Sequence, residues 1–202
     1  MNAESVYALL GTRWRKKRME TFAAMFARSR RVVDLGGTPR NWGWARSFDV
    51  TLVNLDQSQG NRGIDFVCAN ALRCPFRAGA FEVVFSNSLI EHVGTWEEQR
   101  QFAAEVRRLA GRYFIQTPNR WFPIEPHCLA PLVQFVPGRV RPWVAAWLTP
   151  AGWLVPSRQQ FQREMQSLRL LRAREMRKLF PEARIVRERF LGMTKSLIAI
   201  SG

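Results

Sequence analysis

The chain has 202 residues, of which 47% are hydrophobic and 23% are charged. This length and composition exclude a disordered chain, because they supply enough apolar surface for one α/β domain of ordinary size. Lys and Arg number 31 and Asp and Glu number 16, so the formal net charge is +15 at pH 7. Such an excess attracts polyanions, anionic lipids or acidic small molecules, and a solvated surface rich in arginine is the alternative explanation.

The pattern of apolar residues predicts helices and strands that alternate along the chain. Apolar residues at helical spacing predict a first helix over residues 3–28. Short runs rich in β-branched residues predict strands over residues 31–35, 50–56, 64–71, 81–88 and 112–119. Thr95 followed by Glu98 has the pattern of a capping box and predicts a helix that ends at Gly111. Because near-continuous apolar strands are separated by helical segments, we expect a parallel sheet with helices on both faces.

The C-terminal part of the chain predicts two further helices and two further strands. The helices are expected over residues 157–167 and 173–180, and the strands over residues 183–190 and 194–201. Because only a short Gly-Met turn separates the two strands, we expect an antiparallel hairpin at the edge of the sheet.

Cysteine and histidine are too few and too scattered for a metal site, so we expect none. The residues concerned are Cys68, Cys74, Cys128, His92 and His127. Reduced thiols and an N-terminal segment without basic residues indicate a cytoplasmic protein without a signal peptide. The longest apolar stretch, residues 143–155, contains Pro150 and Gly152 and is too short to span a bilayer. A stretch of this kind can instead lie at a membrane surface.

Acidic residues and glycines follow the first two predicted strands. The first predicted strand has Asp34 near its end and is followed by Gly36 and Gly37. The second predicted strand ends at Asp56. In a doubly wound sheet, ligands bind at the carboxyl ends of the strands, where a carboxylate can accept hydrogen bonds from both hydroxyls of a ribose. The pattern therefore indicates a nucleoside-containing cofactor, and the alternative is a tight turn followed by a solvated carboxylate. A dinucleotide is disfavoured, because the third glycine of G-x-G-x-x-G is absent and Pro39 removes an amide donor.

Five segments follow one another in an order that is typical of a known family. They are VVDLGG (32–37), NLD (54–56), CANALRCPF (68–76), FEVVFSNSLIEHV (81–93) and YFIQTPN (113–119). In this order they resemble the motifs of class I S-adenosylmethionine-dependent methyltransferases, and most closely the type 11 small-molecule group. The resemblance implies a single Rossmann-like, doubly wound, seven-stranded sheet with an antiparallel last strand, helices on both faces, and S-adenosylmethionine as the cofactor.

The resemblance also implies which residues would bind the cofactor. Those around its methionine part would be Asp34, Gly36 and Gly37, and the ribose would be held by Asp56. Those flanking the adenine would be Asn70, Ala71 and Leu72, with Ser86 and Asn87 beneath the cofactor at the end of the fourth strand. The sequence departs from the family in its shortened glycine loop, at Asn70, where an acid is common, and at Glu82, where Asp is usual. An asparagine can still accept a hydrogen bond from the adenine amino group.

The motif after the fourth strand contains the candidate catalytic residue. His92 is the candidate general base, because an unperturbed imidazole titrates at about pH 6.5. The alternative is a structural histidine that hydrogen-bonds the loop backbone. Glu91 would either contact the acceptor or pair with one of the many arginines.

Residues 120–156 are rich in Trp, Pro and Leu, and they lie where this family places acceptor-binding insertions. The candidate acceptor contacts in this segment are Trp121, His127, Trp143 and Trp147, in a lid or an apolar pocket. The mixture of Trp and Arg equally suits an anionic membrane surface. The simplest alternative is a pair of short helices that cover the sheet.

We therefore expect a single methyltransferase domain with four segments. These are an N-terminal helical segment (1–29), a cofactor-binding core (30–119), an acceptor lid (120–156) and C-terminal helices with an edge hairpin (157–202). The expected reaction is methyl transfer to a small-molecule, sugar or lipid-linked acceptor by in-line displacement. A nucleotide-dependent oxidoreductase is one alternative, and a non-catalytic module that binds nucleic acid or anionic membrane is another. Nucleic acid is not the expected acceptor, because the Asn-Pro-Pro-aromatic motif of base methylation does not follow the fourth strand.

Overall fold

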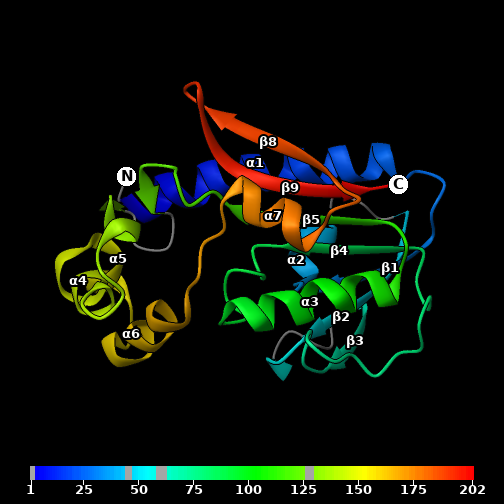
Figure 1. The fold of residues 1–202 in the computed structure, drawn as a ribbon, viewed down its shortest axis with the longest axis horizontal. Helices are drawn as coiled ribbons and strands as arrows, with labels where there is room; N and C mark the ends of the chain where they lie inside the picture. Colours follow the sequence, from blue (N-terminus) through cyan, green and yellow to red (C-terminus); the bar gives the residue numbers. More distant parts are fainter. Residues whose placement is uncertain (1–2, 44–46, 58–62, 126–129) are drawn as a thin grey trace. The chain divides into compact units, whose positions relative to one another are not determined.

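Figure 1 shows the computed structural model of the chain, which describes residues 3–43, 47–57, 63–125 and 130–202. The chain divides into two compact units. The first comprises residues 1–86, 105–114 and 202, and the second comprises residues 87–104 and 115–201. All but one of the predicted cofactor residues therefore lie in the first unit, and all of the predicted catalytic and acceptor residues lie in the second.

The main sheet has seven strands in the order β3-β2-β1-β4-β5-β9-β8. The strands are β1 (Arg31–Leu35), β2 (Asp49–Asn54), β3 (Asp65–Cys68), β4 (Val83–Asn87), β5 (Tyr113–Pro118), β8 (Arg184–Phe190) and β9 (Met193–Ser201). β1 pairs in parallel with both β2 and β4, and β2 pairs in parallel with β3, whereas β8 and β9 are antiparallel. The predicted seven-stranded sheet with an antiparallel last strand is thus confirmed. The strand order reverses between β1 and β4, which is where doubly wound sheets bind ligands.

Helix α1 (Ala3–Met25) supplies the aromatic centre of the first unit's core. The Phe22 ring is fully buried, with its centroid 4.9 Å from that of Phe85 and 5.8 Å from that of Trp42. Met19 is buried on the same side of the helix, and Phe26, the residue after its end, is buried as well, as the predicted helical spacing requires. α1 is the longest helix, but basic residues interrupt it, and no helix among the described residues is long and apolar enough to cross a bilayer.

Strands β2 and β3 are shorter than the sequence predicts, and two asparagines account for the difference. The side-chain oxygen of Asn54 accepts a hydrogen bond from the backbone N–H of Asp56 at 3.1 Å. In the same way, the side-chain oxygen of Asn70 accepts one from the backbone N–H of Leu72 at 2.9 Å. Each contact turns the chain locally, which competes with continued strand pairing. The predicted cofactor residues after these strands therefore lie in loops.

Helix α3 (Trp96–Leu109) begins with the predicted capping box. The backbone N–H of Thr95 donates to the Glu98 carboxylate at 2.7 Å, and the Glu98 N–H donates to the Thr95 hydroxyl at 3.3 Å. Two otherwise unpaired amides are thereby satisfied at the helix start.

The second unit contains a small helical cluster, drawn in yellow in Figure 1. It consists of α4 (Arg141–Leu148), α5 (Pro150–Leu154) and α6 (Arg158–Ser167). Ala145 and Ala146 are the buried residues of α4, and they share a core cluster with Phe161 and Met165 of α6. The short elements before it are β6 (Ile124–Glu125), β7 (Ala130–Pro131) and η2 (Val133–Phe135). Residues 120–156 thus include two short helices, α4 and α5.

Helix α7 (Ala173–Leu179) and the β8–β9 hairpin end the chain. The hairpin turn consists of Leu191 and Gly192, both with positive φ, at 47° and 79°. Two consecutive residues of this kind match the right-handed twist of a tight hairpin. β8 lies at the edge of the sheet, as predicted.

Candidate functional site

The carboxyl ends of β1, β2 and β3 meet at one edge of the first unit. Leu35 pairs with Val53, and Asn54 pairs with Cys68, so the three strands end in register. The backbone N–H of Gly36 donates to the Val53 carbonyl at 2.8 Å, and that of Ala69 donates to the Asn54 carbonyl at 3.2 Å. The loops that carry Gly36, Asp56 and Asn70 therefore leave neighbouring strand ends, and the structure brings these predicted residues to one edge.

The glycine turn after β1 lies directly over the carboxyl group of Asp34. A Cβ atom at position 37 would be 2.0 Å from the Asp34 Oδ2 atom, which only a glycine avoids. Gly36 has a φ of +75°, a conformation that glycine adopts without strain. The side-chain amide of Asn54 donates to the Gly37 carbonyl at 3.1 Å and ties this turn to the end of β2. The backbone is therefore held close to a buried carboxyl group.

Asp34 is buried, and its Oδ2 atom accepts a hydrogen bond of 2.8 Å from the indole N–H of Trp42. Burial raises the pKa of Asp34 to about 8, although the indole hydrogen bond acts in the opposite direction. The carboxyl group is consequently protonated in most molecules at neutral pH. A positive charge placed beside it would lower this pKa and draw the proton off.

Asp56 has a different environment from Asp34. It is exposed two residues after the end of β2, and its backbone N–H is fixed by Asn54. An exposed carboxylate with a fixed backbone suits the recognition of neighbouring hydroxyl groups, which donate to carboxylate oxygens.

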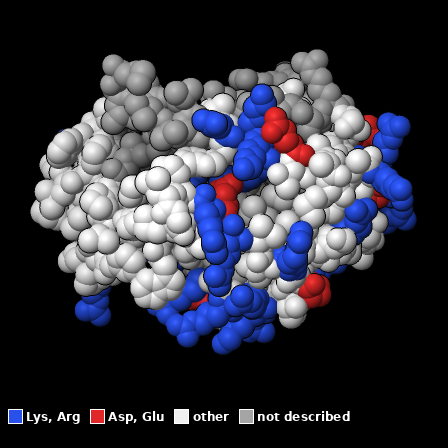
Figure 2. All heavy atoms as spheres, turned by 90° about the horizontal axis from the view of Figure 1, so that it is seen from above, with Lys and Arg blue, Asp and Glu red and all other residues white. Residues whose placement is uncertain are grey.

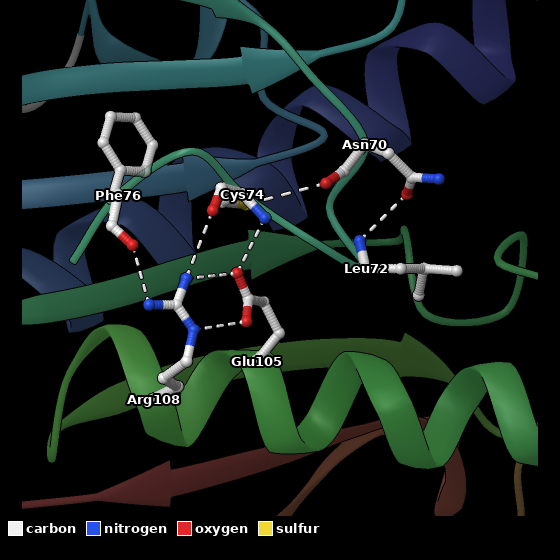
Figure 3. A network of polar contacts seen from close by, with 6 residues as sticks. All are labelled: Asn70, Leu72, Cys74, Phe76, Glu105 and Arg108. Atoms are coloured by element: carbon white, nitrogen blue, oxygen red, sulfur yellow. Dashed lines mark hydrogen bonds and ion pairs between the residues drawn. The ribbon is translucent and has the colours of Figure 1, made fainter. Parts of the chain in front are cut away.

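The loop after β3 is anchored to α3 by two charged side chains (Figure 3). The Glu105 carboxylate accepts the backbone N–H of Cys74 at 2.7 Å and pairs with Arg108. Arg108 in turn donates to the backbone carbonyls of Phe76 at 2.7 Å and of Cys74 at 3.2 Å. Both ends of the segment are thus fixed, because Asn70 also accepts the Leu72 N–H. The network holds the loop that carries the predicted adenine contacts Asn70, Ala71 and Leu72.

The electrostatics of this anchor keep Glu105 ionised and the thiol of Cys74 neutral. Burial alone would raise the pKa of Glu105, but hydrogen bonds from Arg108 and from the Cys74 amide outweigh it and lower that pKa. Burial, followed by the nearby Glu105 charge, raises the pKa of Cys74 to about 12. A thiol with such a pKa is a poor nucleophile, so Cys74 has a packing role.

Ser86 and Asn87 lie at the end of β4, as predicted. Ser86 is buried, and its hydroxyl donates to the Leu35 carbonyl at 2.9 Å. Because this hydroxyl already donates to the neighbouring strand, Ser86 would contact a ligand by van der Waals packing. Asn87 is the last residue of β4 and is partly exposed.

In the second unit, Glu91 and His92 have different surroundings. Glu91 is fully buried, and its carboxylate accepts the Thr117 hydroxyl at 2.9 Å. Its backbone carbonyl accepts the Arg169 N–H at 2.8 Å. His92 is partly exposed, and its backbone N–H donates to Leu89 at 2.7 Å. Of the two, His92 has the more accessible side chain.

The predicted acceptor tryptophans are on the surface of the second unit. The exposed fractions are 57% for Trp121, 56% for Trp143 and 46% for Trp147. Arg158 lies over the Trp147 ring, with its guanidinium carbon 4.5 Å from the ring centroid, and the Trp153 indole donates to the Trp147 carbonyl at 2.8 Å. The backbone of Glu125 is in β6, and His127 lies outside the described residues.

Basic side chains are also prominent on the face of the molecule shown in Figure 2, where they form a band with few acidic side chains. Exposed basic residues of the second unit occur on α7 and β8 and include Arg174, Arg177, Lys178, Arg184 and Arg187. No group of three or more potential metal ligands occurs among the described Asp, Glu, His and Cys residues.

Four residues that hold the site together were not predicted. They are Trp42, Asn54, Glu105 and Arg108, which bond to Asp34, Gly37 and the loop after β3. Glu105 and Arg108 have the i, i+3 spacing of an ion pair on a helix, which was a usable signal. Nothing local distinguishes them from the exposed pair of Glu97 and Arg100 on the same helix, which has the same spacing.

Comparisons with known proteins match part of the chain to a methyltransferase domain. Residues 42–112, from the end of α2 (Pro39–Trp42) to the residue before β5, match the family model of a methyltransferase domain. No protein of curated function matches the chain.

Solved structures of methyltransferases share the fold at low sequence identity. Magnesium protoporphyrin IX methyltransferase from Synechocystis PCC 6803, solved with bound SAH, is 12% identical with a TM-score of 0.59, over 100% of this chain and 89% of that one. The 1,6-didemethyltoxoflavin-N1-methyltransferase from Burkholderia thailandensis is 15% identical with a TM-score of 0.55, over 97% and 82%. The N-methyltransferase NodS from Bradyrhizobium japonicum WM9 is 9% identical with a TM-score of 0.57, over 94% of each chain. At these identities the likeness concerns the fold. The chain therefore shares its fold with solved methyltransferases, and residues 42–112 match a methyltransferase domain.

Proposed function

We propose that the chain transfers a methyl group from S-adenosylmethionine to a small-molecule, sugar or lipid-linked acceptor. The observation that carries the proposal is the glycine turn over the buried carboxyl group of Asp34, beside the loops of Asp56 and Asn70. These groups fit the three parts of the cofactor. A buried carboxyl suits the cationic aminoacyl part, an exposed carboxylate suits the ribose diol, and an amide-bearing loop suits the adenine edge.

The residues of this chain would position the reactants and exclude water. Bound S-adenosylmethionine supplies an electrophilic methyl group. Asp34 would face the ammonium group from below the Gly36–Gly37 turn, Asp56 would accept the ribose hydroxyls, and Ser86 would form part of the floor. The anchored loop after β3 would present Asn70 to the adenine without a large loss of loop entropy on binding.

His92 is the proposed general base for an acceptor that must lose a proton. Its imidazole is partly exposed, and the loop backbone is fixed by the hydrogen bond to Leu89. A neutral imidazole can take a proton from a hydroxyl or amine at physiological pH. His92→Asn would keep the loop geometry and remove this function, so the rate should fall while cofactor affinity is retained.

An oxidoreductase is less well supported, because the helix after the glycine turn does not suit a pyrophosphate. α2 has four residues and begins with Pro39, which lacks an amide hydrogen. Pyrophosphate sites in dinucleotide-binding folds use the amides and dipole at the start of a full helix.

Calorimetric titration with S-adenosylhomocysteine and with NADH tests the proposal. We expect saturable binding of the first and none of the second. Asp56→Ala should weaken binding at least tenfold, because charge-assisted hydrogen bonds contribute about 1.5–3 kcal/mol each. Asp49→Ala, at the opposite end of β2, is the matched control and should bind normally. Binding of NADH alone, or equal affinity of the Asp56 and Asp49 variants, contradicts the assignment.

For the acceptor we propose a small apolar or lipid-linked molecule. We propose that the protein is cytoplasmic and binds this acceptor at an anionic membrane surface. The supporting observation is the exposed face of α4 and α5, which carries Trp143, Trp147, Leu148, Trp153 and Leu154. Arg139, Arg158 and Arg163 are exposed nearby in the sequence, against one acid, Glu164. Indole rings and arginines together favour the interface of an anionic bilayer.

Sedimentation with vesicles tests this membrane contact. Binding to anionic vesicles should exceed binding to neutral ones and should weaken with added salt. Trp153→Ser should reduce it, whereas Leu191→Ser should not, although Leu191 in the β8–β9 turn is even more exposed (80% against 62%). Absence of vesicle binding would remove the membrane from the proposal and leave the proposed transfer to a soluble acceptor.

A further inference from the structure

Four arginines gather in the second unit beside the start of α7. Arg120 directly follows the end of β5 and Asn119, and its backbone N–H donates to the Leu171 carbonyl at 3.0 Å. Arg141 begins α4, and one of its terminal nitrogens donates to the Leu168 carbonyl at 2.8 Å. Arg169 and Arg172 lie in the same short segment before α7. All four side chains are neither fully buried nor fully exposed.

The positive charge of this cluster exceeds its negative charge. Glu175 is a carboxylate that interacts with the cluster, and it pairs with Arg169 at 2.6 Å. Its other oxygen accepts the backbone N–H of Arg172 at 2.8 Å. Burial lowers the pKa of Arg120, and the charges of Arg172, Arg141 and Arg169 lower it further, while Glu175 acts against them. Arginines this close repel one another unless an anion lies among them.

Two donors of the cluster are buried and have no partner in the described part of the chain. The Nε atoms of Arg120 and Arg141 are inaccessible to solvent and have no hydrogen-bond partner among the described residues. Buried donors are almost always paired in folded proteins, because an unpaired one loses its hydration without compensation. Guanidinium groups with spare donors match the planar fork of a carboxylate or the oxygens of a phosphate.

An exposed aromatic surface adjoins the cluster. The guanidinium carbon of Arg172 is 5.0 Å from the centroid of the Trp121 ring. The Trp121 ring lies 5.6 Å from that of Phe135, and both residues are exposed. A flat or apolar group could rest on these rings while an attached anion reaches the arginines.

We propose that Arg120, Arg141 and Arg172 bind an oxyanion, a phosphate or carboxylate, carried by a molecule whose apolar part rests on Trp121. Arg169 holds Glu175 and orients the segment. That the anionic molecule is the methyl acceptor rests on the proposed function, whereas the anion site itself does not. The excess of arginine in this chain thus acquires one specific role besides solvation.

The probe is phenyl phosphate, and phenol and inorganic phosphate are its two halves. We expect phenyl phosphate to raise the melting temperature and to bind with measurable heat, more tightly than either half. Arg120→Gln should weaken this binding at least tenfold. Arg187→Gln, an exposed arginine of β8, is the control and should bind like the parent protein.

Arg172→Gln provides a second variant should Arg120→Gln fail to fold, and it should also bind the probe at least tenfold more weakly. The affinity for S-adenosylhomocysteine should stay within about threefold in each variant. This is a smaller change than tenfold, which corresponds to about 1.4 kcal/mol. Vesicles containing phosphatidic acid distinguish a lipid headgroup from a soluble molecule. If the site takes a soluble molecule, these vesicles should not displace phenyl phosphate. Competition by the vesicles would make the natural source a lipid headgroup and would still support the oxyanion site.

Two results would overturn the inference. One is binding of phenyl phosphate that is unchanged in both cluster variants. The other is binding that weakens equally in Arg187→Gln, since general attraction by net charge would then account for it. If S-adenosylhomocysteine does not bind at all but the probe binds with the expected dependence on Arg120, the proposed function fails and the anion site stands.

Discussion

The anchor between α3 and the loop after β3 can be cut by a single substitution. Glu105→Ala leaves the buried backbone N–H of Cys74 without its acceptor, which costs about 1–3 kcal/mol. It also removes the carboxylate partner of Arg108, and we discount that pair to about 1 kcal/mol because the Arg108 side chain is 36% exposed. We therefore expect the free energy of unfolding to fall by about 2–4 kcal/mol.

The same helix supplies a matched control for this substitution. Glu97 and Arg100 form an ion pair with the same i, i+3 spacing, but their side chains are 75% and 61% exposed. Glu97→Ala should therefore change the free energy of unfolding by no more than about 0.5 kcal/mol. Urea unfolding followed by circular dichroism measures both variants under the same conditions.

Cofactor affinity is the second measurement on these variants. Because Glu105 fixes the loop that carries Asn70 and Leu72, Glu105→Ala should weaken binding of S-adenosylhomocysteine about tenfold, equal to 1.4 kcal/mol. Glu105→Gln keeps an acceptor for the Cys74 amide and should recover part of both losses. Equal effects of the two alanine variants on stability would refute the buried anchor. A destabilised Glu105→Ala that binds the cofactor normally would refute its role in positioning the loop.

Three further predictions concern the glycine turn, its carboxyl group and the acceptor surface. Gly37→Ala should abolish cofactor binding and lower the melting temperature, because the new methyl group would meet the Asp34 carboxyl at 2.0 Å; an unchanged melting temperature would contradict the geometry. Since burial raises the pKa of Asp34 to about 8, most molecules carry this proton at pH 7, and a cationic ligand that lowers the pKa must release it. The affinity for such a cationic ligand should then rise from pH 6 to pH 8. Calorimetry in buffers of different ionisation heat should detect the release of a proton on binding. Uptake of a proton would show that Asp34 does not face the cation. Trp147→Ala should reduce activity with the acceptor and leave the cofactor dissociation constant within about threefold, and the opposite result would remove the tryptophans from the acceptor site.

The sequence predicted the parts of the site that depend on local chemistry. The strand that contains Asp34, the glycine turn after it and the capping box of Thr95 and Glu98 are each specified by a few adjacent residues. The ends of β2 and β3 were predicted too late, because the side chains of Asn54 and Asn70 bond to the backbone two residues on. This competition between strand and turn is not visible in hydrophobic periodicity.

The contacts between distant segments could not be predicted from pattern alone. Trp42 donates to Asp34, and Glu105 accepts from Cys74, across separations that only the folded chain determines. Helix α4 shows a different difficulty, because its buried side is made of Ala145 and Ala146 while its tryptophans face outward. A prediction that assigns large apolar residues to the core would place the opposite, tryptophan-bearing side of this helix in the interior.

The contact between Gly37 and Asp34 ties two positions of the sequence to each other. With an aspartate at position 34, any side chain at position 37 overlaps the carboxyl group. A protein that replaced this aspartate with a smaller residue would be free to place alanine or serine in the turn. Substitutions at the two positions are therefore expected to accumulate together during divergence. The aspartate thus dictates the residue that can follow three positions later in the turn.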